Sequence, residues 1–84
     1  MIVYNDQSRI TYEKVQIDIY AQDIGNISKK RVARELAKLA DEYMTKLNLQ
    51  RTGFSPDAIV RDASLHRIVV TYEGNLLENT RRFI

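Results

Sequence analysis

The chain has 84 residues, a formal net charge of +2 and 44% hydrophobic residues, which predicts one domain, residues 1–84, with a thin core. The absence of cysteine excludes disulfide bonds and thiolate metal sites, and no apolar run is long enough to cross a membrane. The weak positive charge does not favour nucleic-acid binding, because domains that grip a phosphate backbone carry a denser basic patch.

Residues 1–6 lack the basic and apolar regions of a signal peptide, so we expect synthesis in the cytoplasm. A strand is predicted over residues 10–21, because apolar and polar side chains alternate there with a period of two. Its apolar face carries Val15, Ile17, Ile19 and Ala21. Tyr12 and Tyr20 fall on the polar face, where two interpretations stay open: a contact surface, or ordinary packing on a pleated sheet.

A loop with Gly25 and Asn26 leads into a helix predicted over residues 29–47. Ser28 is suited to cap it, because its hydroxyl can accept a hydrogen bond from an unpaired N–H of the first turn. The apolar stripe consists of Val32, Leu36, Leu39, Ala40, Tyr43 and Leu47. We expect the helix to pack on the sheet through Leu36, Leu39, Ala40 and Tyr43. Replacing either leucine with alanine would then cost about 2–5 kcal/mol.

At least two strands are expected after the helix, over residues 49–54 and 65–73. A turn is predicted at residues 55–57, a brief strand at 58–60, and a break in the later strand at 73–75. One face of that later strand carries Ile68, Val70 and Tyr72. Residues 81–84 are either a final edge strand or a frayed end. The fold class is therefore α+β: a small, mostly antiparallel sheet in strand–helix–strand–strand order, with one amphipathic helix packed on one face.

No residue pattern in the chain indicates catalysis. His66 is the only histidine and lies in a strand, without a nucleophile elbow or a serine–histidine–acid spacing. The glycines are isolated, and the acidic residues show no metal-ligand spacing. We therefore expect a protein that is not an enzyme, with no catalytic residues, cofactor or metal, in which His66→Ala leaves the biological role intact.

The charges of the predicted helix are in the reverse of the favourable order. Lys29, Lys30 and Arg31 crowd its start, whereas Asp41 and Glu42 lie in its second half. Each such charge costs roughly 0.3–1 kcal/mol at an exposed helix end. Two interpretations stay open: a solvated surface screened by salt, or a surface for an acidic partner. In the second, the basic end meets Asp41 and Glu42 of a neighbouring copy, or a different protein.

The order of several short motifs resembles a known family. Leu47-Asn48-Leu49-Gln50-Arg51-Thr52 is followed by His66-Arg67-Ile68-Val69-Val70-Thr71-Tyr72-Glu73-Gly74, and then by Asn79 and Arg82. This order is similar to the closing part of the small tail-completion, or tail-to-head joining, proteins of siphophages. The strand at 10–21, followed by a helix, also resembles theirs. Where those proteins tend to have Gly-Phe before the arginine, this chain has Asn48-Leu49-Gln50.

The resemblance, which covers about residues 10–84, implies a non-enzymatic structural protein of the virion, made in the host cytoplasm. Proteins of this family end the growth of the tail tube and dock it to the head connector. Tail-tube and connector proteins would be the partners. The resemblance also implies monomers in solution that assemble into homo-oligomeric rings in the virion.

A small RNA-binding module is the alternative interpretation. In such modules, aromatic side chains on the sheet stack on bases, a role for Tyr12, Tyr20 and Tyr72 here, while Arg51, Arg61 and Arg67 would contact phosphates. The clustered aromatic and glycine motif of these modules is absent from the sequence. Salt dependence of any RNA binding separates the two interpretations, because phosphate contacts give a steep negative slope.

Overall fold

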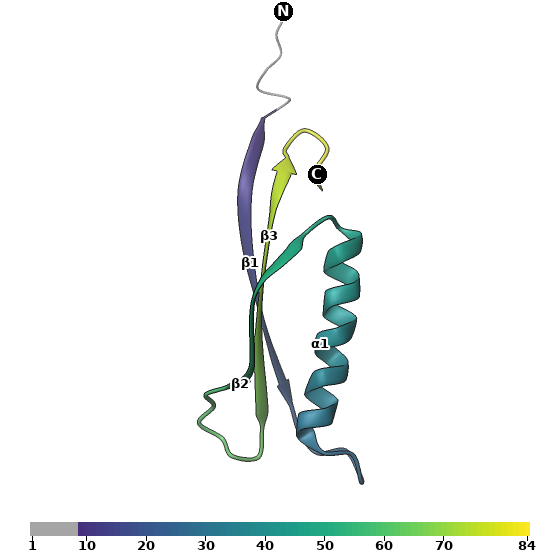
Figure 1. Cartoon of the computed structure of the whole chain (residues 1–84), viewed down its shortest axis with the longest axis vertical. Helices are drawn as coiled ribbons and strands as arrows, with labels where there is room; N and C mark the ends of the chain where they lie inside the picture. The colour runs from purple at the N-terminus through teal and green to yellow at the C-terminus, as the bar shows by residue number, and fades with distance from the viewer. Residues whose placement is uncertain (1–8) are drawn as a thin grey trace, which may run out of the picture.

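The computed structural model describes residues 9–84. They form strand β1 (Ile10–Ala21), helix α1 (Lys29–Lys46) and strands β2 (Gln50–Ala58), β3 (His66–Leu77) and β4 (Arg82–Phe83). The strands make one 4-stranded antiparallel sheet in the order β1-β3-β2, with β4 paired to β3. Helix α1 lies along one face of this sheet and runs opposite to β1 (Figure 1). The α+β fold class and the element order are therefore confirmed.

Strands β1 and β3 are the long central pair. Their register is unbroken from Ile10↔Leu77 to Ala21↔His66. The predicted apolar faces lie opposite one another in this register, for example Ile19 against Ile68. Ile68, Val70 and Tyr72 are buried beneath the helix, so the period of two predicted both faces correctly.

Strand β2 is longer than predicted. It continues through the expected turn at residues 55–57 to Ala58, with register shifts between Arg51 and Gly53 and between Ser55 and Ala58. The expected turn and the separate strand at 58–60 were therefore wrong. The reason is the position of β2 at the sheet edge, where a proline and bulges are tolerated because few ladder hydrogen bonds are lost.

Strand β3 also continues where a break was expected, at residues 73–75. A Cβ atom on Gly74 would lie 2.8 Å from Leu49 Cδ2 and 3.2 Å from Phe83 Cδ1. This glycine therefore serves close approach of two apolar side chains to the strand, not a turn. The chain end forms β4 beside it, which settles the choice between an edge strand and a frayed end in favour of a strand.

Helix α1 begins and ends with ordinary capping chemistry. Ser28 Oγ accepts from the Arg31 backbone N–H at 3.3 Å, which confirms the predicted N-cap. After the helix, Asn48 has φ 66°, a left-handed conformation that glycine and asparagine adopt most readily at this position. Asn48 therefore suits the helix end, and the next residue, Leu49, is buried.

The side of α1 that packs on the sheet differs from the prediction. Ala33 and Ala37 are buried, and Ala40 and Met44 pack against the core beside them. In contrast, Leu36, Leu39 and Tyr43 are 42%, 60% and 72% exposed. The expectation that these three residues form the contact was therefore wrong, and only Ala40 was placed correctly. Small alanine side chains let the helix approach the sheet closely, which turns the larger residues outward.

Candidate interaction surfaces

Large apolar side chains line the side of α1 that faces the β1 edge of the sheet. Leu36, Leu39 and Tyr43 follow one another at helical spacing and are exposed. Leu36 lines a surface hollow together with Tyr20 and Ala21 at the end of β1. This contact shows that the side of the helix that carries Leu36 faces the β1 edge. We call Leu36, Leu39 and Tyr43 the apolar flank. Contiguous exposed apolar residues are typical of a surface that contacts another protein.

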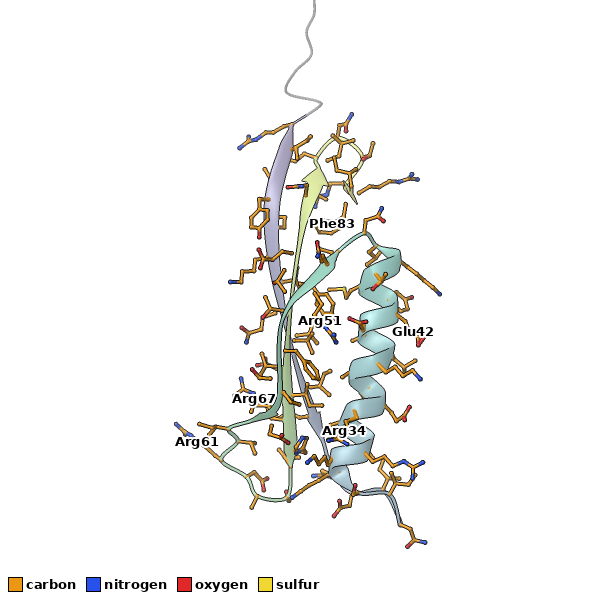
Figure 2. The ribbon with its side chains drawn as sticks, viewed as in Figure 1. Arg34, Glu42, Arg51, Arg61, Arg67 and Phe83 are labelled. Carbon is orange, nitrogen blue, oxygen red and sulfur yellow. The ribbon has the colours of Figure 1, made fainter. Side chains whose placement is uncertain are left out.

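The opposite side of α1 faces β2 and is polar. A groove of about 430 Å³ lies between them. It is lined by Arg34, Ala37, Lys38, Asp41, Arg51, Phe54, Pro56 and Val70. Figure 2 shows Arg51 reaching from β2 toward the helix, and Arg34 at the lower end of the same side. Three basic side chains against one carboxylate leave this groove with a positive balance, which suits an acidic ligand better than a basic one.

Asp41 links the groove to the core. The Tyr72 hydroxyl donates to Asp41 Oδ1 at 3.1 Å, and Arg51 Nη1 lies 3.9 Å from the same oxygen. The Arg51 guanidinium also stacks over the Phe54 ring, 5.0 Å from its centroid. Burial, and then the hydrogen bond to Asp41, raise the pKa of Tyr72 to about 12. Asp41, Tyr72 and Arg51 therefore have polar or aromatic partners within the chain.

The predicted basic cluster at the start of α1 contacts its own chain. Lys29 Nζ donates to Ala63 O in the loop between β2 and β3, and Lys30 Nζ lies 3.7 Å from Asp57 Oδ1. Asp23 Oδ1 accepts from the Lys29 backbone N–H at 2.6 Å, which places a carboxylate at the positive end of the helix dipole. The unfavourable charge order is thus offset by acids of the same chain.

Asp41 and Glu42 lie on different sides of the helix. Asp41 is part of the β2 groove, whereas Glu42 points away from the sheet (Figure 2). Among residues 9–84, Arg31 and Glu42 make no ion pair and are exposed. The pairing of the basic cluster with Asp41 and Glu42 of another copy stays a prediction. Arg31 and Glu42 are the residues best placed for it.

The three tyrosines of the RNA-binding interpretation do not form one platform. Tyr12 and Tyr20 lie on the open face of the sheet, 63% and 50% exposed, whereas Tyr72 is buried on the face covered by the helix. At ~3.3 Å per residue, Tyr12 and Tyr20 are separated by about 26 Å along β1. Adjacent bases cannot stack on side chains so far apart.

The three arginines of that interpretation do not converge either. Arg51 belongs to the β2 groove, and Arg61 lies in the loop after β2, away from the helix (Figure 2). Arg67 is committed within the chain. Its Nη1 donates to Ile59 O at 3.0 Å, and its Nη2 donates to Asp18 Oδ2 at 3.2 Å. Its guanidinium also lies 5.8 Å from the centroid of the Tyr20 ring. Arg67 therefore fastens the β2–β3 loop to the open face of the sheet.

His66 is placed against the end of β2. Its Nε2 lies 2.8 Å from Pro56 O and 3.5 Å from Asp57 Oδ1, and its side chain is mostly buried. Because a carbonyl oxygen only accepts, Nε2 is the donor in this hydrogen bond, and His66 therefore has a structural role. Within residues 9–84 no three histidine, aspartate or glutamate side chains gather as a metal site would require.

Sequence reasoning missed the apolar flank as a surface, although a signal for it exists. Two apolar lines run along the helix with the same spacing, offset by one residue. One consists of Ala33, Ala37, Ala40 and Met44, and the other of Val32, Leu36, Leu39, Tyr43 and Leu47. Together they are wider than the stripe that one sheet face covers. The line of smaller residues packs inward, which leaves the larger line for another contact.

Comparisons with protein-family models, with curated proteins and with solved structures found no match. In the part of the chain that the structure describes, no helix is both long and apolar enough to cross a membrane.

Proposed function

We propose that this chain is a structural protein of the siphophage head–tail junction, which completes the tail tube and docks it to the head connector. The observation that carries the proposal is the apolar flank. A subunit that works by assembly needs a surface that is unsatisfied until its neighbours arrive, and Leu36, Leu39 and Tyr43 provide one.

The order of sequence motifs supports the same role, because it resembles that of tail-completion proteins over nearly the whole chain. On this proposal the partners are tail-tube and connector proteins together with further copies of the chain, arranged as a ring. The protein is made in the host cytoplasm and ends in the virion. The positive β2 groove supplies a second contact surface for an acidic segment of a partner.

Deletion of the gene from its phage tests the proposal. Electron microscopy of the lysate should then show full heads and tails that fail to join, or tails of abnormal length, and a plasmid copy should restore joined particles. A copy with Leu39→Glu should fail to restore them, whereas Thr45→Glu, an exposed helix position outside the apolar flank, should succeed. Normal particles after deletion would contradict the proposal. RNA binding with a steep salt dependence would favour the RNA-binding interpretation.

A further inference from the structure

Strand β1 is a long edge strand of unusual regularity. It pairs with β3 on one side and with no other strand of the described chain on its other side. Its 12 residues contain no proline, and its register with β3 has no bulge. Such an edge presents a row of backbone donors and acceptors that another strand can pair with. Natural edge strands are often protected by proline, bulges or charged side chains; β1 has no proline or bulge, and its charged residues are Glu13, Lys14 and Asp18.

The side chains of β1 are complementary to those of a second, antiparallel copy. When Gln16 is placed opposite Gln16 of the second copy, Lys14 falls opposite Asp18, and by symmetry Asp18 falls opposite Lys14. Tyr12 then faces Tyr20, as an aromatic cross-strand pair. On the helix-facing side, Val15 meets Ile17, and Glu13 meets Ile19. This register also centres the two strands on each other, so nearly the whole of β1 (Ile10–Ala21) is paired.

Other long registers lack this match, and the register that places Lys14 opposite Glu13 pairs only residues 10–17 and puts the two helices on opposite faces of the sheet. Sliding one strand until Lys14 faces Lys14, or Asp18 faces Asp18, opposes like charges, which is unfavourable. The remaining positions between these two leave Lys14 and Asp18 without a partner of opposite charge. Asp18 already accepts from Gln16 Nε2 and Arg67 Nη2, and it can also accept from the incoming lysine, because an ionised carboxylate has about four acceptor sites. Lys14 makes no ion pair among the described residues.

The apolar flank provides a second, independent contact for the same arrangement. A two-fold axis perpendicular to the sheet at Gln16 keeps both helices on one face of the joined sheet. Because Leu36, Leu39 and Tyr43 face the β1 edge, the two apolar flanks then point toward each other across the seam. The open strand edge, the charge register and the exposed apolar residues therefore all fit one occupant, a second copy of the chain.

We infer that two copies pair through antiparallel β1 edges, in the register that places Gln16 opposite Gln16, and form a continuous sheet with the apolar flanks at its seam. This dimer differs from the monomer that the family resemblance implies in solution. It uses the same apolar flank as the proposed function, with a second copy as the neighbour, and it leaves the β2 edge and groove available for other contacts.

Sedimentation equilibrium of the purified chain is the first test. We expect a species of twice the 9.8 kDa chain mass at micromolar concentration. Leu39→Glu should raise the dissociation constant at least tenfold, and Thr45→Glu should change it less than twofold. A monomer at all concentrations, or equal effects of the two variants, would overturn the inference.

Cysteine cross-linking tests the register itself, because the natural chain has no cysteine. Directly opposed residues have Cα atoms roughly 4.5–5.5 Å apart, within the range a disulfide spans. Under mild oxidation Gln16→Cys should form a covalent dimer at least tenfold faster than Lys14→Cys, whose copies would lie ~13 Å apart along the strand. A mixture of Lys14→Cys and Asp18→Cys should cross-link to each other faster than Lys14→Cys to itself. Cross-linking that is equal at all positions would contradict β1 pairing, whatever the fate of the phage-assembly proposal.

Discussion

The two sides of helix α1 behave in opposite ways. On the β2 side, each polar group near the core has a partner within the chain: Tyr72 binds Asp41, and Arg51 lies between Asp41 and Phe54. On the β1 side, the apolar flank of Leu36, Leu39 and Tyr43 is exposed. On the first side, the polar groups next to the core are satisfied within the single chain. The second side has the apolar composition of a core, but nothing in the chain packs on it. Such an exposed apolar surface is typical of a site that contacts another protein.

This contrast teaches that size, and not apolar character alone, decided which line of helix residues entered the core. Ala33 and Ala37 allow the helix backbone close to β3, where Ile68, Val70 and Tyr72 supply the bulk. A leucine line packed inward would hold the helix farther from the same strand. The larger residues are therefore available for contacts beyond the chain.

The largest expected effect is the difference in stability between alanine variants of the buried core and of the exposed apolar flank. Ile68→Ala should lower the free energy of unfolding by about 2–5 kcal/mol, because Ile68 is fully buried. Leu39→Ala should lower it by less than about 1 kcal/mol in dilute solution, since exposed positions contribute little. Urea unfolding at low protein concentration measures both. Equal losses would show that Leu39 is buried in the single chain, contrary to the structure.

Removal of the Tyr72 hydroxyl probes the completed side. Tyr72→Phe keeps the buried ring but loses the hydrogen bond to Asp41, which should cost about 1–2 kcal/mol. Thermal or urea unfolding near neutral pH gives this value. A variant as stable as the wild type would show that the hydrogen bond between Tyr72 and Asp41 does not stabilise the fold.

The same tyrosine predicts a pH dependence. Its pKa rises from 10.0 to about 12 on folding, so between these values the folded chain holds a proton that the unfolded chain has lost. The resulting contribution of Tyr72 to the free energy of unfolding is complete below pH ~10 and disappears as the pH rises through about 12. Over that window the wild type should lose more stability than Tyr72→Phe. Parallel pH profiles of the two proteins would contradict this assignment.

A smaller effect is expected from Arg51, at the outer boundary of the completed side. Arg51→Met retains much of the side-chain length but loses the ion pair with Asp41 and the stacking on Phe54. Because both charged side chains are substantially exposed, the loss should be about 0.5–1 kcal/mol. The part of this loss that comes from the ion pair should be smaller at high salt, because salt screens the charges. Chemical unfolding at low and high ionic strength checks this, and a loss above about 2 kcal/mol would refute it.

The smallest stability effect is expected on the open side. Leu39→Glu should change the stability of the dilute chain by no more than about 0.5 kcal/mol, as is usual for surface substitutions. Circular dichroism melting at two protein concentrations separates the chain from its assembly. The wild type should melt at a higher temperature when concentrated, and the variant should not. A large loss in the dilute variant would mean that the flank already has a partner inside the chain.

Much of the fold was predictable because its signals are local. The period of two identified β1 and the buried face of β3, and Ser28 identified the start of α1. The extension of β3 through Gly74 was not predictable, because the reason for that glycine is the approach of Leu49, which precedes β2, and of Phe83 in β4. The strand pairing of Pro56 likewise depends on β2 being an edge, which only the topology reveals.

The candidate surfaces were less predictable for the same reason. Lys29 and Lys30 read as a surface for a partner, but the β2–β3 loop returns beside them and supplies Ala63 O, while Asp57 comes from the end of β2. Tyr72 is no companion of Tyr12 and Tyr20, because it shares the buried face of β3 with Ile68 and Val70, as the period of two predicts. Long-range placement decided the first outcome, and the local period of two decided the second.

The most direct test of the open side is amide hydrogen exchange of the wild-type chain at two protein concentrations. Amides of β1 that point away from β3 should exchange rapidly in the dilute chain and at least tenfold more slowly in the concentrated one, because edge pairing engages them. Amides of β2 should exchange at the same rate in both samples. Protection of β1 that is independent of concentration, or concentration-dependent protection confined to β2, would contradict the account of β1 and the apolar flank as the surface at which copies meet.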